Sequence, residues 1–313
     1  MRPYFLIGFG VLSAAAFAGG DDILDVLSQK AKGLKYSGTR VISLVRAGKI
    51  ERHEEYVTRS GSNMRIEFSR ESPFHGQIIV ETANERRHYF PDQNEIMVFP
   101  TFGRHQFDSV RGSFRDRKRG AKITTGEGEN IVGFRTSKIR MADRDGNPIF
   151  DVYADMKSGL TLKRVMYDPA GGTIGTFEFT KLTLNPKLMA NAFSIQRNGA
   201  KIVRPIDLLR RKATSIGMEP VTLKSGSPFK LETVFVREIK GIKVLVQNFV
   251  KPDSRITLFA TKSSLGSNDM MGFKRKELSS HMWQLNGVTL ILMGSESQDA
   301  LKALARQVAE DQP

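Results

Sequence analysis

Hydrophobic and polar positions alternate with a period of two through most of the chain. Around Met64, Ile66 and Phe68, each apolar residue is followed by a polar or charged one. This alternation is typical of a strand with one buried face and one face in water. Similar runs recur between turn signals such as Ser60-Gly61 and Ser158-Gly159. They predict strands over 36–46, 50–59, 63–69, 76–82, 86–90, 95–99, 121–125, 131–142, 148–155, 160–168 and 173–184.

Helical patterns are sparse in this first part of the chain. A helix is predicted from Asp21 to Gly33, with carboxylates at its start, where they suit the positive end of the helix dipole. A short turn of helix is expected in NPKLMANAFSI, from Asn185 to Ile195. Because the strands follow one another without helices between them, we expect an antiparallel sheet.

The chain after residue 197 predicts a separate domain. Residues 198–205 have the composition of a linker, and a helix is predicted over 206–215. Strands are predicted over 230–238, 242–250, 255–262, 272–278 and 288–293. A final helix has an apolar face made of Ala300, Leu301, Leu304, Ala305 and Val308. We therefore expect a mostly β, α+β chain, with a first domain over 21–197 and a small sheet-and-helix domain over 206–313.

The first residues predict a targeting signal. MRPYFLIGFGVLSAAAFA has one basic residue, a short apolar run and an Ala16-Phe17-Ala18 ending that fits signal cleavage. The run is shorter than the roughly 20 apolar residues of a membrane span. We interpret 1–18 as a cleaved signal peptide, which predicts a protein that is exported and soluble after cleavage.

Composition narrows the classes of partner. The chain has no Cys, which excludes disulfides, thiol catalysis and Cys-ligated metals. Its net charge is +15 and its pI is near 10.0. This balance favours anionic partners such as lipid head groups, lipopolysaccharide or an acidic protein, and export argues against nucleic acid.

With both halves described, the chain resembles the RseB/MucB family, the periplasmic regulators of the sigma-E envelope-stress pathway. In the first half the resemblance lies in YSGTRVISLVRAGKIERHEEY and DGNPIFDVYADMKSGLTLKRVMYDPAGG. In the second half it lies in FKLETVFVREIKGIKVLVQNFVKPDSRITLFAT and MWQLNGVTLILMGSESQDALKALARQV. It implies an N-terminal LolA-like half-barrel of about eleven antiparallel strands, with covering helices.

The resemblance also implies a function. A family member would bind the periplasmic segment of a membrane anti-sigma factor, and lipid, lipoprotein or lipopolysaccharide acyl chains would weaken that complex. The alternative is a LolA-like periplasmic carrier of lipoproteins or lipids. A simple carrier needs one domain, whereas this chain predicts two, which favours the regulator. Peripheral contact with a membrane is compatible with both.

An enzyme is the third hypothesis, and the sequence gives it little support. His53-Glu54-Glu55 lies in a predicted strand and lacks the helical H-E-x-x-H spacing of a metal site. No G-x-S-x-G elbow occurs. Asp143 and Asp145 are better explained by a hairpin turn than by a cation site. We expect no catalysis, no metal and no cofactor.

Two candidate sites remain. The first is a basic segment with residues Arg111, Arg115, Arg117, Lys118 and Arg119, which is either a solvated loop or a docking patch for an anionic partner. The second is an apolar cavity on one face of the curved sheet, and ordinary core packing is the alternative for each of its residues. Its candidate lining residues are Met64, Ile66, Phe68, Ile78, Val80, Met97, Phe99, Phe107, Phe114, Met141, Phe177 and Phe179. Trp283 is expected to anchor the core of the second domain.

Overall fold

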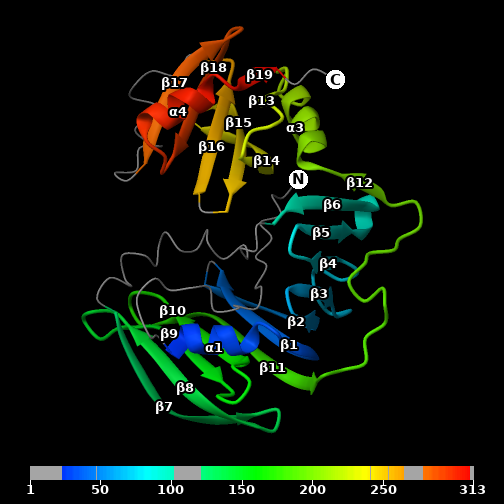
Figure 1. Cartoon of the computed structure of the whole chain (residues 1–313), viewed down its shortest axis with the longest axis vertical. Helices are drawn as coiled ribbons and strands as arrows, with labels where there is room; N and C mark the ends of the chain where they lie inside the picture. The colour runs from blue at the N-terminus through cyan, green and yellow to red at the C-terminus, as the bar shows by residue number, and fades with distance from the viewer. Residues whose placement is uncertain are drawn as a thin grey trace. The chain divides into compact units, whose positions relative to one another are not determined.

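The structure, a computed structural model, describes residues 23–46, 48–101, 121–239, 241–252, 254–263 and 278–310. The described residues form two compact units (Figure 1). The first contains residues up to Asn94 together with 121–198, and the second contains 95–101 and 199–310. The second unit therefore includes a short piece of chain from well before the predicted linker. Within 198–205 the chain forms a short strand, and a helix begins at Pro205.

The first unit is built almost entirely of strands. One helix, α1 (Ile23–Ala31), precedes them. The strands are β1 (Lys35–Arg46), β2 (Lys49–Ser60), β3 (Asn63–Phe68), β4 (Ile78–Glu81), β5 (Glu85–Phe90), β7 (Lys122–Ile131), β8 (Phe134–Ala142), β9 (Pro148–Ala154), β10 (Thr161–Tyr167) and β11 (Thr173–Leu184). A 3-10 turn, η1 (Pro91–Gln93), follows β5.

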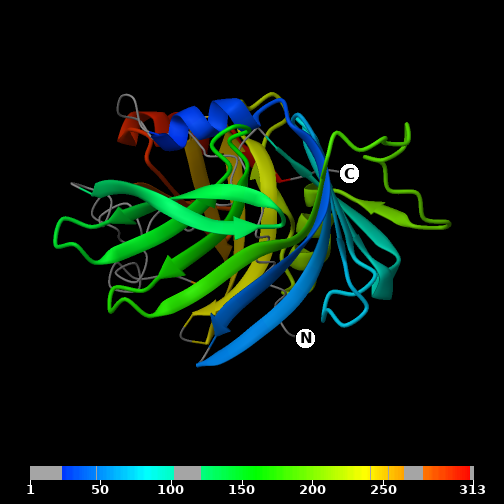
Figure 2. The same ribbon diagram turned by 90° about the horizontal axis from the view of Figure 1, so that it is seen from below.

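These ten strands lie in the order β5-β4-β3-β2-β1-β11-β10-β9-β8-β7. Every pair of neighbours is antiparallel, so the expected antiparallel pairing is confirmed for these ten strands. The first and last strands in chain order are joined at the centre, where β1 pairs with β11. Figure 2 shows the resulting curved, open half-barrel. The mostly β fold class predicted from sequence is confirmed.

Tight turns connect the strands where the sequence has glycine. Gly61 and Gly171, for example, have positive φ angles of 58° and 83°, a conformation that residues with a Cβ rarely adopt. Gly159 also has a positive φ, and it has a second role. Its Cα lies so close to the carbonyl oxygen of Leu27 in α1 that any side chain would collide there. The turn before β10 is thus a contact surface for α1.

Two local predictions for this unit are wrong. The strand predicted over 131–142 begins three residues later, because Val132 and Gly133 form a turn with positive φ angles. The segment 185–198 contains no helix. It runs instead over β3 and β5, where the Ser194 carbonyl accepts a hydrogen bond from Arg65 at 2.7 Å and Arg197 lies over the ring of Tyr89.

The second unit has a small sheet with helices on one face. Its elements are β6 (Glu95–Pro100), β12 (Lys201–Val203), α3 (Pro205–Thr214), β13 (Val221–Leu223), β14 (Lys230–Ile239), β15 (Ile242–Lys251), β16 (Ser254–Thr261), β17 (Ser279–Leu285), β18 (Val288–Gly294), α4 (Gln298–Ala305) and β19 (Val308–Glu310). The five-stranded sheet has the order β14-β15-β16-β18-β17 and is antiparallel. Its core includes Leu209 of α3, Leu301 of α4 and Leu258 of β16, all fully buried.

Three features of this unit differ from the prediction. β6 and β12 pair in parallel, so the twelve-stranded large sheet to which both belong is mixed rather than purely antiparallel. Val308 lies in β19, which pairs with β13, and not in the final helix. The strand predicted over 272–278 lies almost wholly outside the described residues, and the described strand in this region is Ser279–Leu285. Trp283 packs half-buried against the core, as expected.

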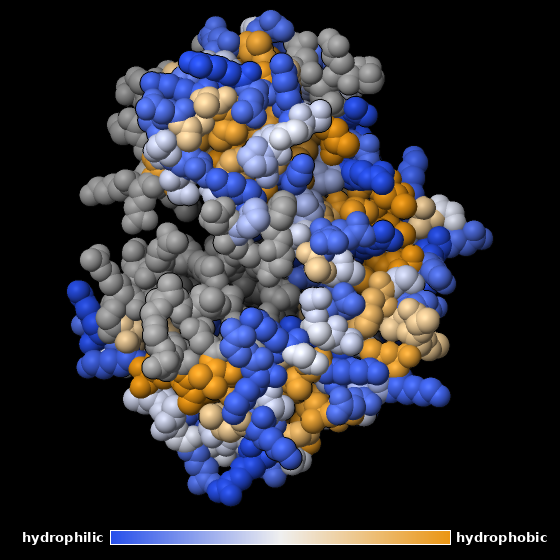
Figure 3. Space-filling model, viewed as in Figure 1, coloured by the Kyte–Doolittle hydropathy of each residue, from blue (hydrophilic) through white to orange (hydrophobic). Residues whose placement is uncertain are grey.

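None of the described helices is long and apolar enough to cross a membrane. On the face seen in Figure 3, hydrophilic side chains of the described residues are interspersed with smaller hydrophobic groups.

Candidate functional site

Residues from six neighbouring strands form one continuous row across a face of the first unit. In register, Ile139, Val152, Arg164, Phe177, Ile42 and His53 oppose one another from β8 to β2. Residues directly opposite each other in a sheet share a face. Leu27 of α1 packs on the same side, against a cluster that contains Ile139 and Val152. We call this the inner face, and the opposite side the outer face.

The inner face carries charged groups among its apolar side chains. Arg40 on β1 is fully buried and donates from Nε to Oε2 of Glu55 on β2 at 2.8 Å. His53 contacts the other carboxylate oxygen of Glu55 at 3.1 Å. Burial opposes ionisation of Glu55, but Arg40 and His53 outweigh it, so its pKa lies below the usual value. The inner face therefore contains a buried Arg40–Glu55 ion pair, with His53 in contact with the same carboxylate.

Arg164 on β10 also lies on the inner face, and its surroundings differ from those of Arg40. Its Cζ lies 4.7 Å from the centroid of the Phe150 ring. Its Nε is buried and has no hydrogen-bond partner. Burial lowers its pKa to about 10, which leaves it protonated at neutral pH. Among the described residues no carboxylate pairs with it.

The apolar candidates of the inner face belong to packed cores. Five of them, Met64, Ile66, Phe68, Phe177 and Phe179, lie in one buried cluster. Met141 lies in the neighbouring cluster beneath α1. None of these six side chains is more than 9% exposed. The structure thus brings them together on the predicted face, where they serve as core.

Of the other six candidates, four do not join this group and two lie outside the described residues. Ile78 and Val80 oppose Glu67 and Arg65, so the register puts them on the outer face, whereas Ile79 opposes Ile66 on the inner face. β4 is buried on both sides, and its sequence therefore has no alternation from which the face could be predicted. Met97 and Phe99 lie half-buried on β6 of the second unit. Phe107 and Phe114 are outside the described residues, as is the basic segment Arg111, Arg115, Arg117, Lys118 and Arg119.

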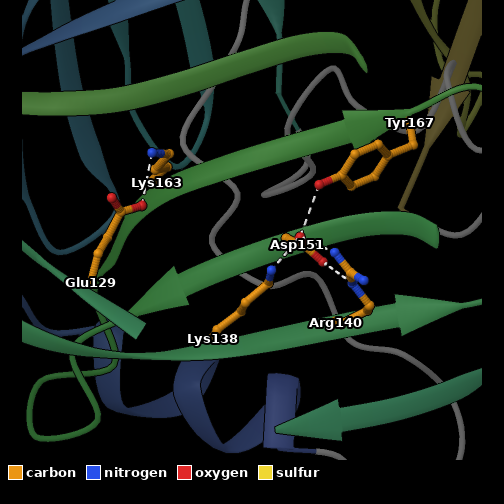
Figure 4. A network of polar contacts seen from close by, with 6 residues as sticks. All are labelled: Glu129, Lys138, Arg140, Asp151, Lys163 and Tyr167. Carbon is orange, nitrogen blue, oxygen red and sulfur yellow. Dashed lines mark hydrogen bonds and ion pairs between the residues drawn. The ribbon is translucent and has the colours of Figure 1, made fainter. Parts of the chain in front are cut away.

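The outer face carries a polar network around Asp151 (Figure 4). The Asp151 side chain is 1% exposed, and Arg140 donates to its two oxygens at 2.7 and 2.8 Å. Lys138 lies 3.0 Å from Oδ2, and the Tyr167 hydroxyl donates to the same oxygen at 2.9 Å. Burial opposes ionisation of Asp151, but these donors outweigh it and hold its pKa below the usual value. A carboxylate so fully engaged acts as a structural anchor, because it has little capacity left to accept a substrate proton.

A second group of charges continues along this face. Lys163 lies 2.8 Å from Glu129 and 3.0 Å from Glu178, which pairs in register with it. Lys138 and Lys163 approach the ring of Tyr153, at 5.6 and 5.4 Å from its centroid. The aromatic ring thus lies between two ion clusters, and the network extends across β7 to β11.

The sites weighed for metal chemistry have ordinary roles. His53 and Glu55 share a side of β2, where His53 contacts the carboxylate of the buried Arg40–Glu55 ion pair. Asp143 accepts hydrogen bonds from the backbone N–H of Asp145 and Asn147, at 3.0 and 2.9 Å, and so forms the expected hairpin turn. Within the described ranges, no group of three or more His, Asp or Glu side chains is arranged to hold a metal ion.

Sequence reasoning missed Arg40, Arg164 and Asp151. A signal for Arg164 exists, because it has the same parity in its strand as the apolar residues Leu162 and Met166. A charged residue at an apolar position of an alternating strand predicts a buried charge. Asp151 gives no such signal, since its strand PIFDVYA is apolar on both sides.

Comparison with known proteins gives matches only at the level of structure. No family model and no curated protein matches the sequence. The chain is similar to a solved structure of the MucA/MucB complex of Pseudomonas aeruginosa, at 14% identity and a TM-score of 0.43, over 93% of this chain and 98% of that one. It is also similar to an uncharacterized conserved protein of Thermus thermophilus, at 14% identity and a TM-score of 0.43, over 57% and 98% of the two chains.

A LolA superfamily protein of Nitrosomonas europaea is a third similar structure. It has 10% identity and a TM-score of 0.29, over 55% of this chain and 97% of that one. Because each of these TM-scores is below 0.5, we argue the function of this chain from its own residues.

Proposed function

We propose that this chain is a non-enzymatic binding and regulatory protein of the periplasm, of the RseB/MucB kind that its sequence resembles. In this proposal it binds the periplasmic segment of a membrane anti-sigma factor. A lipid, a lipoprotein or the acyl chains of lipopolysaccharide then weaken that complex. Such a response requires only that the amphiphile binds the free form of the protein more tightly than the complexed form.

The observation that carries the proposal is the presence of two compact units with separate cores. The first unit is a long open sheet whose inner face is largely apolar. The second has its own five-stranded sheet and a core of eighteen buried residues. A carrier of acyl chains requires only the first kind of unit. A second folded unit supports a second binding partner, as a regulator needs.

The test is direct binding of the two partners. The mature protein is mixed with the periplasmic segment of an anti-sigma factor from the same organism, and the complex is measured by calorimetry. We expect a saturable complex that protects the segment from a protease. Adding a lysolipid below its critical micelle concentration is expected to raise the apparent Kd of that complex. Absence of any complex would overturn the regulatory proposal.

The alternative function is a periplasmic carrier of lipids or lipoproteins. The apolar inner face of the first unit favours it, because an acyl chain could replace part of that core. A carrier moves a labelled lipid from donor to acceptor vesicles without any protein partner. Transfer by this protein, together with no binding of the anti-sigma segment, would establish the carrier in place of the regulator.

A further inference from the structure

The register places four arginines on the inner face, namely Arg40, Arg59, Arg86 and Arg164, of which the first three are buried and Arg164 is half-buried. Arg40 and Arg164 differ in the partners that the described residues supply to them. Arg40 has Glu55, with Nη2 to Oε2 at 2.6 Å and both side chains at most 2% exposed. Arg164 has the Phe150 ring and no described carboxylate. Phe177 on β11 lies between them, because it opposes Arg164 in register and its ring is 5.8 Å from Arg40 Cζ.

The lack of a counter-ion for Arg164 among the described residues destabilises the free protein. A guanidinium removed from water loses hydration that an ion pair or hydrogen bonds normally replace. The Phe150 ring replaces part of it through a cation–π contact. It leaves the buried Nε without an acceptor. Buried polar groups in native proteins nearly always have a partner, so an unfilled one calls for a partner from outside.

We propose that Arg164 is an anion-binding site on the inner face, which accepts the carboxylate or phosphate of an amphiphile. The inference rests on the proposed function in one respect, namely that the inner face takes an apolar chain. It adds the chemical class of the head group and the residue that selects it. A neutral amphiphile of the same chain length would leave Arg164 as it is in the free protein.

The surroundings of Arg164 fit such a ligand. Its guanidinium is flanked by Phe150, and its cross-strand partners are Val152 and Phe177, all three of them buried and apolar. The side chain as a whole remains half-buried, so it is not sealed from solvent. An anion in a surrounding of low dielectric gains more from a guanidinium than it would in water. The apolar neighbours in turn favour a ligand that carries hydrocarbon beside its charge.

The test compares three ligands that separate charge from chain. Delipidated mature protein is titrated by calorimetry at pH 7.5 with laurate, with methyl laurate and with acetate. We expect laurate to bind at least tenfold more tightly than methyl laurate, because a hydrogen bond to a charged group contributes about one to two powers of ten in affinity. Acetate is expected to bind far more weakly than laurate, since it lacks the chain.

Variants assign the charge preference to one residue. Arg164→Gln is expected to bring laurate to the affinity of methyl laurate and to leave methyl laurate unchanged. Arg144→Gln removes the same charge from a turn where the side chain is 81% exposed, and should keep the wild-type preference. Retention of the preference in Arg164→Gln would overturn the inference.

The wild-type titrations test the inference even if Arg164→Gln does not fold. Equal affinity for laurate and methyl laurate overturns the anion site and leaves the amphiphile proposal standing. Acetate that binds as tightly as laurate overturns the amphiphile class. Binding of neither long-chain ligand overturns the inference and the amphiphile part of the proposed function, while binding of the anti-sigma segment is measured separately.

Discussion

Arg40 and Glu55 form a buried ion pair across β1 and β2, with 2.8 Å between Arg40 Nε and Glu55 Oε2. They are direct cross-strand partners, and His53 contacts the same carboxylate. Removing one member of a buried pair leaves the other charge without compensation in a medium of low dielectric. The stability of the first unit should therefore depend on both.

Glu55→Gln is expected to lower the free energy of unfolding by about 3–5 kcal/mol, measured by urea unfolding at pH 7. The matched control is Glu127→Gln, whose partner Arg135 is 84% exposed, and it should change nothing measurable. Because the pKa of Glu55 is lowered in the folded state, its contribution is present at neutral pH. It should disappear as the pH falls from about 4.5 through the folded pKa. A loss of stability equal to that of the control would contradict the role of the pair.

His88 predicts a loss of stability in mild acid. It is buried on β5 and donates a hydrogen bond from Nε2 to Oε1 of Gln77 at 2.8 Å. Its pKa lies well below 6.5 because of burial and of the nearby Arg86. The unfolded chain therefore binds a proton more readily, and stability falls as the pH drops below about 6.5. His88→Gln keeps a hydrogen-bonding partner for Gln77 and removes the titration. Between pH 7.5 and 5.5, the free energy of unfolding should fall by up to about 1.4 kcal/mol less in the variant than in the wild type.

Asp151 is expected to be the main stabilising group of the outer face. Asp151→Asn replaces an ionised acceptor with an amide and disturbs its hydrogen bonds with Arg140 and Tyr167. We expect a loss of about 2–3 kcal/mol, since hydrogen bonds to charged groups contribute more than neutral ones. Thermal and urea unfolding measure it. If the folded variant still binds the partner, Asp151 has a structural role. If the variant is as stable as the wild type and no longer binds the partner, the outer face contains a binding site.

Gly159 offers a test of how α1 is held. Ala at this position would collide with the Leu27 carbonyl and come within 2.7 Å of the Lys30 Cβ. Gly171 has nearly the same backbone, with φ of 83° against 77°, and open space around it. Gly171→Ala therefore measures the cost of the left-handed conformation alone, about 1 kcal/mol. Gly159→Ala should be clearly less stable than Gly171→Ala, with faster amide exchange in α1. Equal losses would show that α1 does not depend on this contact.

The basic segment 111–119 remains a sequence-based prediction. Replacing Arg115, Arg117, Lys118 and Arg119 with Ser is expected to weaken binding to anionic phosphatidylglycerol vesicles in a cosedimentation assay. The control removes four positive charges from exposed sites, namely Lys181, Lys187, Lys201 and Lys224. Unchanged binding by the first variant, or an equal loss by the control, would refute a local patch.

The alternation of apolar residues was sufficient to predict most strands. In β3 the burial alternates residue by residue, so the sequence pattern and the structure agree. The alternation did not predict which face a side chain occupies in β4, because both sides of that strand are buried. It also did not predict the parallel pairing of β6 with β12, because the two strands lie far apart in the chain. Local patterns contain no information on such pairings.

In the candidate site, too, alternation within a strand could be predicted from the sequence, whereas pairing between strands could not. Phe68, Phe177 and Phe179 were placed together correctly because their strands alternate. Arg40 and Glu55 were not recognised as a pair, since the register that joins them is set by the hairpin between β1 and β2. Arg40 has a counter-ion among the described residues and Arg164 has none, a difference that depends on three-dimensional neighbours and could be learned only from the structure.

The parallel pair of β6 and β12 has a consequence for synthesis. Met97 pairs with Val203, which emerges from the ribosome about a hundred residues later. At roughly 5–20 residues per second, that edge of β6 has no partner for about 5–20 seconds of translation. Its row of free N–H and C=O groups is then a template for pairing with another chain. A chaperone that holds extended segments before folding thus has a defined target at 95–100.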